Sequence, residues 1–313
     1  MNQADLKKQD PDELKKKNIL HIQDLSKFYG EKCVLHNVDL SVKEGEFCTV
    51  VGPSGCGKST LLKLILGQER QDEGDVFIES KPAGYPDPKR GVVYQKYSLY
   101  PNMTVLENVM LSHSLSNGYV ERRRRKKEFL EEAMMYIEKV KLADHIKKMP
   151  DELSGGMQQR VAIVQALIKR PKILLMDEPF GALDPGTRED LQIFLLKLWK
   201  EYGMTILFIT HDLEEAVYIS TRIVVLSQYY RDGRPVAGNN HGSRIVADYP
   251  ICRAVLSTKV KETADFGELI GEIRKIGFDP KYLQRVTDFN LLHPDSFQTL
   301  TPEECEMDVE DKK

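Results

Sequence analysis

Cysteine is sparse in this chain, with five residues among 313, and none of the five belongs to a C-x-x-C pair. We therefore expect free thiols in a reducing cytosol. No apolar run approaches the roughly 18 residues that a membrane-spanning helix needs, and residues 1–17 lack the apolar core of a secretory signal. The net charge of −3 provides no basic surface for nucleic acid, so we predict no nucleic-acid partner.

The composition is that of a globular protein, with 41% apolar and 30% charged residues. A length of 313 residues suits one large domain with an appendage, or two domains. We divide the chain into a charged, disordered tail (1–17), a main domain (18–230) and a C-terminal extension of unknown role (231–313).

Short apolar runs rich in branched residues predict strands at 46–51, 172–176 and 204–210. Runs of this kind are typical of interior strands in a mainly parallel sheet that is covered on both faces. Between the first two runs, the leucines and isoleucine of 61–66 end at Gly67, which predicts a helix and its C-terminal stop. The fold class is therefore α/β.

The middle of the chain, about 98–168, predicts a helical insertion. Thr104 and Glu107 have capping-box spacing, and apolar residues recur at helical spacing over 129–140. The basic run "ERRRRKKE" (121–128) indicates either a contact with a partner or lipid headgroups, or a solvated helix face, which we favour. In the extension, we expect a loop or linker over 231–244 and an amphipathic helix over 266–277.

A phosphate-binding loop is predicted from "GPSGCGKST" (52–60), which fits the pattern G-x-x-x-x-G-K-S/T between a strand and a helix. Glycines allow several backbone N–H groups to converge on one phosphate cluster. Lys58 adds a point charge for the outer phosphates, and the Ser59 hydroxyl is a ligand for Mg²⁺. A chance glycine turn would not account for the Lys-Ser-Thr ending. The nucleotide-binding residues are Gly52, Pro53, Ser54, Gly55, Cys56, Gly57, Lys58, Ser59 and Thr60.

Two carboxylates end the apolar run "ILLMDEP" (173–179), where a strand meets a ligand crevice in sheets of this class. We assign Asp177 to Mg²⁺ and Glu178 to polarising the attacking water. The alternative is that both residues only begin the turn before Pro179, which the phosphate loop makes less favoured.

A second glycine turn, in "LSGGMQQR" (153–160), opens another predicted helix. Ser154 is placed as its N-cap, and Gly155 and Gly156 leave backbone N–H groups accessible, which is an anion site. Asp184, followed by Pro185, is a further predicted helix N-cap.

In these motifs and their order, residues 18–230 resemble the ATPase subunit of an ABC transporter. The resemblance implies a P-loop ATPase fold with an antiparallel β subdomain, ATP and Mg²⁺ as cofactors, and a catalytic set of Lys58, Gln95, Glu178 and His211. It further matches Tyr29 to the aromatic residue that stacks on adenine, and Gln95 to the glutamine whose amide can reach Mg²⁺ or the attacking water. "LSGGMQQR" matches the family signature, and Asp184 lies in the match to the D-loop. Taken alone, Gln95 is more typical of a surface residue and His211 of a structural one.

The resemblance also implies partners. Two subunits stack head-to-tail, so that Ser154, Gly155 and Gly156 of one close over the nucleotide of the other, and a homodimer is expected. The residues within the motifs are similar to those of the importer branch for nitrate, sulfonates and taurine. This resemblance implies membrane permease subunits and a solute-binding protein as partners, and a peripheral location on the cytoplasmic face of the inner membrane. Asn102 and Gln165 depart from that branch's pattern. Two alternatives stay open: an ATPase of envelope lipid or lipoprotein transport, and a soluble ABC ATPase without a transport role.

Overall fold

A computed structural model describes residues 15–87, 89–95, 98–116, 118–232, 242–251, 261–286 and 289–299. The chain divides into two compact units, Met1–Pro86 with Leu207–Lys313, and Asp87–Ile206. Most of the predicted N-terminal tail lies outside the described residues, but Lys17 is placed and its ammonium donates to Asp295 Oδ1 at 2.8 Å. The two units are described in turn.

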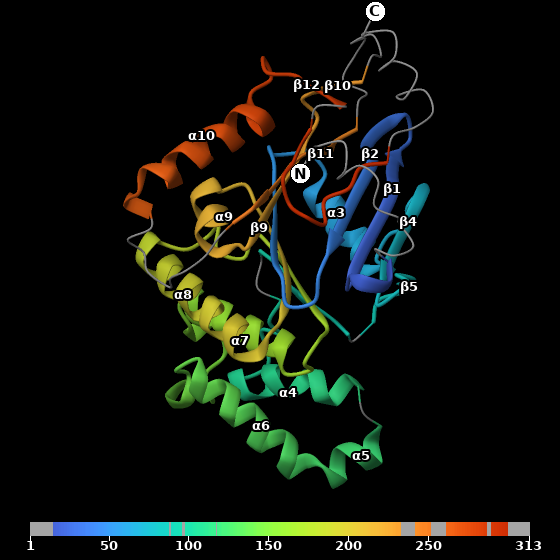
Figure 1. The fold of residues 1–313 in the computed structure, drawn as a ribbon. Helices are drawn as coiled ribbons and strands as arrows, with labels where there is room; N and C mark the ends of the chain where they lie inside the picture. The colour runs from blue at the N-terminus through green and yellow to red at the C-terminus, as the bar shows by residue number, and fades with distance from the viewer. Residues whose placement is uncertain are drawn as a thin grey trace, which may run out of the picture. The chain divides into compact units, whose positions relative to one another are not determined.

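The first unit contains an antiparallel sheet with the strand order β2-β1-β4-β5. Its long central strand β1 (Leu20–Tyr29) pairs with β2 (Lys32–Val42) on one side and β4 (Glu73–Ile78) on the other, and β5 (Lys81–Pro82) closes the edge. This sheet is the predicted antiparallel subdomain, and it is visible beside α3 in Figure 1.

The part of a second sheet that belongs to this unit has the strand order β13-β11-β9-β3-β8. β3 (Phe47–Val51) runs parallel to β9 (Arg222–Ser227), and every residue of both strands and of β8 (Thr205–Thr210) is buried. The strands predicted at 46–51 and 204–210 are thus confirmed. Helices α3 (Lys58–Leu66) and α9 (Leu213–Ile219) follow β3 and β8 in the chain.

The described part of the C-terminal extension packs within the first unit. Strand β11 (Arg244–Pro250) was not predicted, and it adds an antiparallel partner to β9. Helix α10 (Ala264–Phe278), which confirms the predicted amphipathic helix, packs against α9, β9 and β11. Two short parallel ladders complete the region, β11 with β13 (Asn290–Leu291), and β10 (Tyr230–Arg231) with β12 (Gln284–Arg285). Residues 233–241 of the predicted loop lie outside the described residues.

The second unit combines two parallel strands with a group of helices. Strands β6 (Arg90–Val93) and β7 (Ile173–Asp177) pair in parallel. Thr104 N–H donates to Glu107 Oε2 at 2.8 Å and Glu107 N–H to Thr104 Oγ1 at 3.3 Å, so the predicted capping box forms. The helices of the unit are α4 (Val105–Ser116), α5 (Tyr119–Arg124), α6 (Lys126–Lys139), the 3-10 turns η1 (Ala143–His145) and η2 (Pro150–Glu152), α7 (Gly155–Leu167) and α8 (Pro185–Tyr202).

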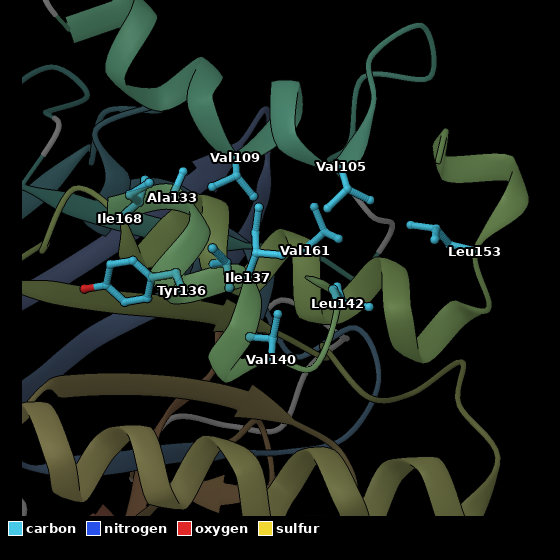
Figure 2. Packing of buried hydrophobic residues seen from close by; sticks show 11 residues of the cluster. Val105, Val109, Ala133, Tyr136, Ile137, Val140, Leu142, Leu153, Val161 and Ile168 are labelled. Atoms are coloured by element: carbon cyan, nitrogen blue, oxygen red, sulfur yellow. The ribbon is translucent and has the colours of Figure 1, made fainter. Parts of the chain in front are cut away.

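Helices α4, α6 and α7 bury a common apolar core, in which Val105 and Val109 of α4 face the side chains of α6 and α7 (Figure 2). Burial of aliphatic side chains of this size contributes roughly 1.5–3 kcal/mol each, so these contacts outweigh the low helix propensity of the valines. The full cluster is Val105, Val109, Ala133, Tyr136, Ile137, Val140, Leu142, Leu153, Val161, Val164 and Ile168.

Within the basic run, which spans α5 and the start of α6, Arg125 pairs with acidic residues of these two helices. Arg125 Nε donates to Glu128 Oε2 at 2.8 Å, and its Nη1 reaches Glu121 Oε1 at 3.4 Å. Local pairing of this kind favours the solvated helix face over a dedicated partner surface. Across the described residues, no helix is both long enough and apolar enough to span a membrane.

Candidate functional site

The predicted phosphate loop joins β3 to α3. Gly52 directly follows β3 at a position with no room for a side chain, because a Cβ there would lie 2.1 Å from the Leu226 carbonyl oxygen. Gly57 has φ +95° at the N-cap of α3, and a Cβ on it would meet Leu35 and Val34 at 2.9 Å. These two positions therefore accept only glycine, one for space and the other for both space and backbone conformation.

Lys58 turns back into its own loop. Its ammonium donates to the carbonyl oxygens of Gly52 at 2.8 Å and Pro53 at 3.0 Å, and the residue is 6% exposed. The two bonds use two of the three donors of an ammonium group. They hold the Lys58 ammonium beside the phosphate loop. The N-terminus of α3 follows this loop, and the helix dipole there also favours an anion.

The remaining loop residues divide by exposure. Ser54, Gly55 and Ser59 are exposed, Pro53 and Thr60 are half-buried, and Cys56 is buried. Burial raises the pKa of the Cys56 thiol, so the side chain is a neutral packing group at neutral pH. Hydroxyls and backbone thus form the outer surface of the loop.

Two further predicted residues belong to the first unit. Tyr29 is the last residue of β1, and the residue is 46% exposed. His211 is exposed and directly follows β8, the neighbour of β3 in the sheet. The next residue, Asp212, caps α9 by accepting the Glu215 N–H at 3.1 Å, which fixes the turn that carries His211.

In the second unit, Gln95 and the two carboxylates stand at one end of a strand pair. β6 and β7 run parallel with Val93 opposite Met176, so both strands end at the same edge. Asp177 is the last residue of β7, and Gln95 lies two residues beyond β6. A Cβ added to Gly181 would lie 3.5 Å from Gln95 Nε2, which places the amide beside the turn that follows Glu178.

Glu178 has φ +44°, in the left-handed region. A residue with a Cβ adopts this conformation at a cost of roughly 1–3 kcal/mol, and such positions cluster at functional sites. The turn is closed by Gly181 N–H donating to the Glu178 carbonyl oxygen at 3.2 Å.

Two helix N-termini of the second unit are in contact. Ser154 caps α7 by accepting the Met157 N–H at 3.4 Å, and Asp184 caps α8 by accepting the Thr187 N–H at 2.9 Å, so both predicted caps are confirmed. A Cβ on Gly156 would lie 2.3 Å from Thr187 Cγ2. Thr187 was not predicted as a site residue. Its contact is with Gly156, 31 positions earlier, and no local sequence pattern indicates a contact of that kind.

The donor sets fit the groups that the sequence predicts. The close approach at Gly52 and Gly57 and the inward Lys58 suit a polyphosphate. The Ser59 hydroxyl, the Gln95 amide oxygen and the Asp177 carboxylate are hard oxygen ligands of the kind that Mg²⁺ prefers. The roles of these individual residues remain predictions.

A strand, a glycine loop with an inward lysine, a helix and a second strand ending in two carboxylates define a P-loop nucleoside triphosphatase. Residues 35–181 match the family model described as ABC transporter. The chain belongs to the family of ABC transporter ATP-binding proteins.

Named relatives agree with that assignment. The chain is 39% identical over 258 residues to the aliphatic sulfonates import ATP-binding protein SsuB of Bacillus thuringiensis subsp. konkukian, covering 80% of this chain and 97% of the relative. It is 43% identical over 212 residues to the bicarbonate transport ATP-binding protein CmpD of Synechococcus elongatus, covering 66% of this chain and 75% of the relative. A dimeric structure of a bacterial ABC transporter cassette matches with a TM-score of 0.61 and 32% identity, over 75% of this chain and all of that one.

The family membership establishes the activity of the chain as ATP binding and ATP hydrolysis coupled to transport. It also confirms the predicted P-loop fold class.

Proposed function

We propose that this chain is the ATP-hydrolysing subunit of an importer for a small anion such as nitrate, a sulfonate or taurine. The similarity to the SsuB and CmpD proteins, whose names specify sulfonates and bicarbonate, supports a small anion as the solute. The observation that carries the catalytic part is the shared end of β6 and β7, with Gln95 beside the turn that begins at the left-handed Glu178.

At the ATP site, each residue is proposed to act through the position described above. The phosphate loop binds the triphosphate through its backbone and Lys58, and Tyr29 stacks on adenine. Ser59, Gln95 and Asp177 hold Mg²⁺, which, when bound, neutralises charge on the phosphate oxygens. Glu178 polarises the attacking water, and His211 donates to the terminal phosphate.

The working state is proposed to be a dimer of two such chains. The N-terminus of α7 presents backbone N–H groups at Ser154, Gly155 and Gly156, and this anion site lies apart in the sequence from the phosphate loop. In the dimer, these groups and Asp184 complete the site of the other subunit. The dimeric cassette structure that the chain resembles supports this arrangement.

The chain is proposed to act at the cytoplasmic face of the inner membrane, bound to integral permease subunits and served by a solute-binding protein. An affinity purification from detergent-solubilised membranes tests this part. We expect a permease with several apolar spans to copurify, and recovery of no membrane protein would contradict a transport role. A lipid-transport permease in its place would support the alternative of envelope lipid or lipoprotein transport.

Substitution of Glu178 by glutamine tests the catalytic assignment. The amide keeps the shape of the side chain but is not a base, and general-base catalysis contributes about 10²- to 10⁴-fold. We expect phosphate release to fall by at least about a hundredfold, ATP binding to be retained, and an ATP-bound dimer to accumulate in size-exclusion chromatography. Glu131→Gln, at an exposed position on α6, is the matched control. A Glu178→Gln protein that hydrolyses ATP at the normal rate would falsify the assignment.

A further inference from the structure

The hydroxyl of Tyr29 is held by a carboxylate that the ATP-site motifs do not include. It donates to Glu69 Oε2 in a close contact, and Glu69 Oε1 accepts from Lys63 Nζ at 3.0 Å. Glu69 therefore links the end of β1 to the last turn of α3, the helix that starts at Lys58.

The position of Glu69 is determined by the end of that helix. Gly67 ends α3 with φ +72°, and the N–H of Gln68 returns to the Lys63 carbonyl oxygen at 2.9 Å. A Cβ on Gly67 would lie 2.0 Å from the Gly84 carbonyl oxygen, so the turn accepts only glycine. The turn thus fixes the backbone position from which the Glu69 side chain extends.

The bond between Tyr29 and Glu69 is charge-assisted. The bond to Tyr29 lowers the pKa of Glu69, with Lys63 acting in the same direction. The same bond raises the pKa of Tyr29. At neutral pH the donor is therefore a protonated phenol and the acceptor an ionised carboxylate, which is the stronger class of hydrogen bond.

Lys27 restrains the ring from another side. Its ammonium lies 5.5 Å from the centroid of the Tyr29 ring. The ammonium is itself fixed by donating to the Arg70 carbonyl oxygen at 2.7 Å and by an ion pair with Asp72 at 3.2 Å. The ring is thus contacted at its hydroxyl and on one face, although Tyr29 as a residue is 46% exposed.

We propose that Glu69 is a positioning residue for nucleotide binding, because it holds the ring of Tyr29 in place as a stacking surface for a purine base. This inference rests on the proposed function of Tyr29 as the residue that stacks on adenine. A side chain that is ordered before binding does not lose its rotamer freedom on binding. The expected gain in affinity for ATP is about three- to tenfold.

The test compares five variants of the full chain: Glu69→Ala, Glu69→Gln, Tyr29→Phe, Tyr29→Ala and the double variant Glu69→Ala/Tyr29→Phe. Affinity is measured by titration with a fluorescent ATP analogue, and by its displacement with inorganic tripolyphosphate, which has no base. We expect Glu69→Ala and Tyr29→Phe each to weaken binding of the analogue about three- to tenfold and to leave tripolyphosphate unchanged. The double variant should bind no more weakly than Tyr29→Phe does, because the bond that Glu69→Ala removes is already lost in that variant.

Two further measurements separate positioning from a general structural effect. The amide oxygen of Glu69→Gln still accepts a hydrogen bond, so this variant should keep most of the affinity. In ATP hydrolysis, Glu69→Ala should raise KM by the factor seen in binding, with kcat within about twofold of the unsubstituted chain. Glu73→Ala, at an exposed carboxylate of β4, is the matched control.

The outcomes also separate this inference from the proposed function. If Tyr29→Ala weakens binding of the analogue but Tyr29→Phe and Glu69→Ala do not, Tyr29 stacks on the base without Glu69 and the positioning role is wrong. If Glu69→Ala weakens tripolyphosphate as much as the analogue, Glu69 acts through α3 and the inference is also wrong. If Tyr29→Ala binds normally, the stacking role itself fails and the inference fails with it.

Discussion

The methyl group of Thr187 fills the space that a side chain at Gly156 would need. A Cβ at Gly156 would lie 2.3 Å from Thr187 Cγ2, while the next nearest atom, Thr187 Cβ, is 3.7 Å away. The contact joins the first turn of α7 to the first turn of α8. The signature turn at Ser154 and the capped turn at Asp184 are therefore parts of one packed structure.

This contact predicts a substitution and its rescue. Gly156→Ala should destabilise the protein by about 1–3 kcal/mol, the usual cost of overpacking, and lower ATP turnover because the signature turn is displaced. Thr187→Ser removes the methyl group, so the Gly156→Ala/Thr187→Ser protein should regain most of both properties. Thermal unfolding and phosphate release measure the two effects, with Thr187→Ser alone as the control. Equal loss in the single and double variants would contradict the contact.

Ser154→Arg tests the proposal that the signature turn serves a neighbouring subunit. The side chain of Ser154 is exposed and its known local task is a cap on α7. An arginine there should leave ATP binding by the monomer nearly intact and abolish both ATP-dependent dimerisation and turnover. Ser154→Ala, which removes only the cap at a cost of about 1 kcal/mol, is the milder control. Normal dimerisation of the arginine variant would count against a cross-subunit site.

The buried pair of Arg222 and Asp248 predicts a large loss of stability when one partner is removed. Arg222 Nε donates to Asp248 Oδ1 at 2.8 Å and Nη2 to Oδ2 at 2.5 Å, and both residues are buried. Asp248→Ala should lower the free energy of unfolding by about 3–5 kcal/mol, because it removes the bidentate partner of a buried guanidinium and leaves only Glu46 Oε1, at 3.5 Å, as a carboxylate partner. Arg222→Met/Asp248→Leu should cost less, since it removes the guanidinium together with its bidentate carboxylate. Denaturant titration measures both, and a double variant worse than Asp248→Ala would refute this reasoning.

The pKa of Asp39 predicts a pH-dependent anchor for the C-terminal segment. Asp39 accepts the N–H of Asp24 at 2.8 Å and of Thr299 at 2.7 Å. Burial nevertheless raises its pKa from 3.8 to about 7; Asp24 also raises it, whereas the two hydrogen bonds and Arg244 oppose the rise. The folded state therefore keeps a proton that the unfolded state has released, and the stabilisation is full below about pH 4 and is lost as the pH rises through about 7.

Asp39→Asn tests that sign. Asparagine does not ionise, so the free energy of unfolding of the unsubstituted chain should fall relative to this variant between about pH 4 and about pH 7 and stay level above that. Denaturant titrations at several pH values measure the difference, and Asp75→Asn, at an exposed site on β4, is the control. The same slope for the Asp39→Asn variant and the unsubstituted chain would show that another group is responsible.

Local features of the fold were predictable from residues close together in the chain. The caps at Ser154 and Asp184 and the capping box of Thr104 involve partners three positions away, which a sequence pattern displays directly. The buried strand β3 was equally predictable, because a short apolar run between polar residues is typical of a buried strand.

Contacts between distant segments were not predictable in this way. Strand β11 contains a buried carboxylate, Asp248, which Arg222 of the neighbouring strand and Ser296 satisfy. The segment ending at Thr299 packs on β2, 260 positions from Asp39. The extension after residue 230 therefore looked separable in the sequence, whereas its described part is built into the first unit.

The sequence by itself determined the chemical inventory of this protein: the glycine loop with Lys58, the carboxylates Asp177 and Glu178, and the turn at Ser154. Tertiary structure decided which side chains stand together, such as Gln95 beside Gly181, Glu69 on Tyr29 and Thr187 against Gly156. The physical reason is that motifs arise from hydrogen bonds and backbone angles within a few residues. Side-chain neighbours between elements arise from packing, which depends on the volume and direction of many residues at once.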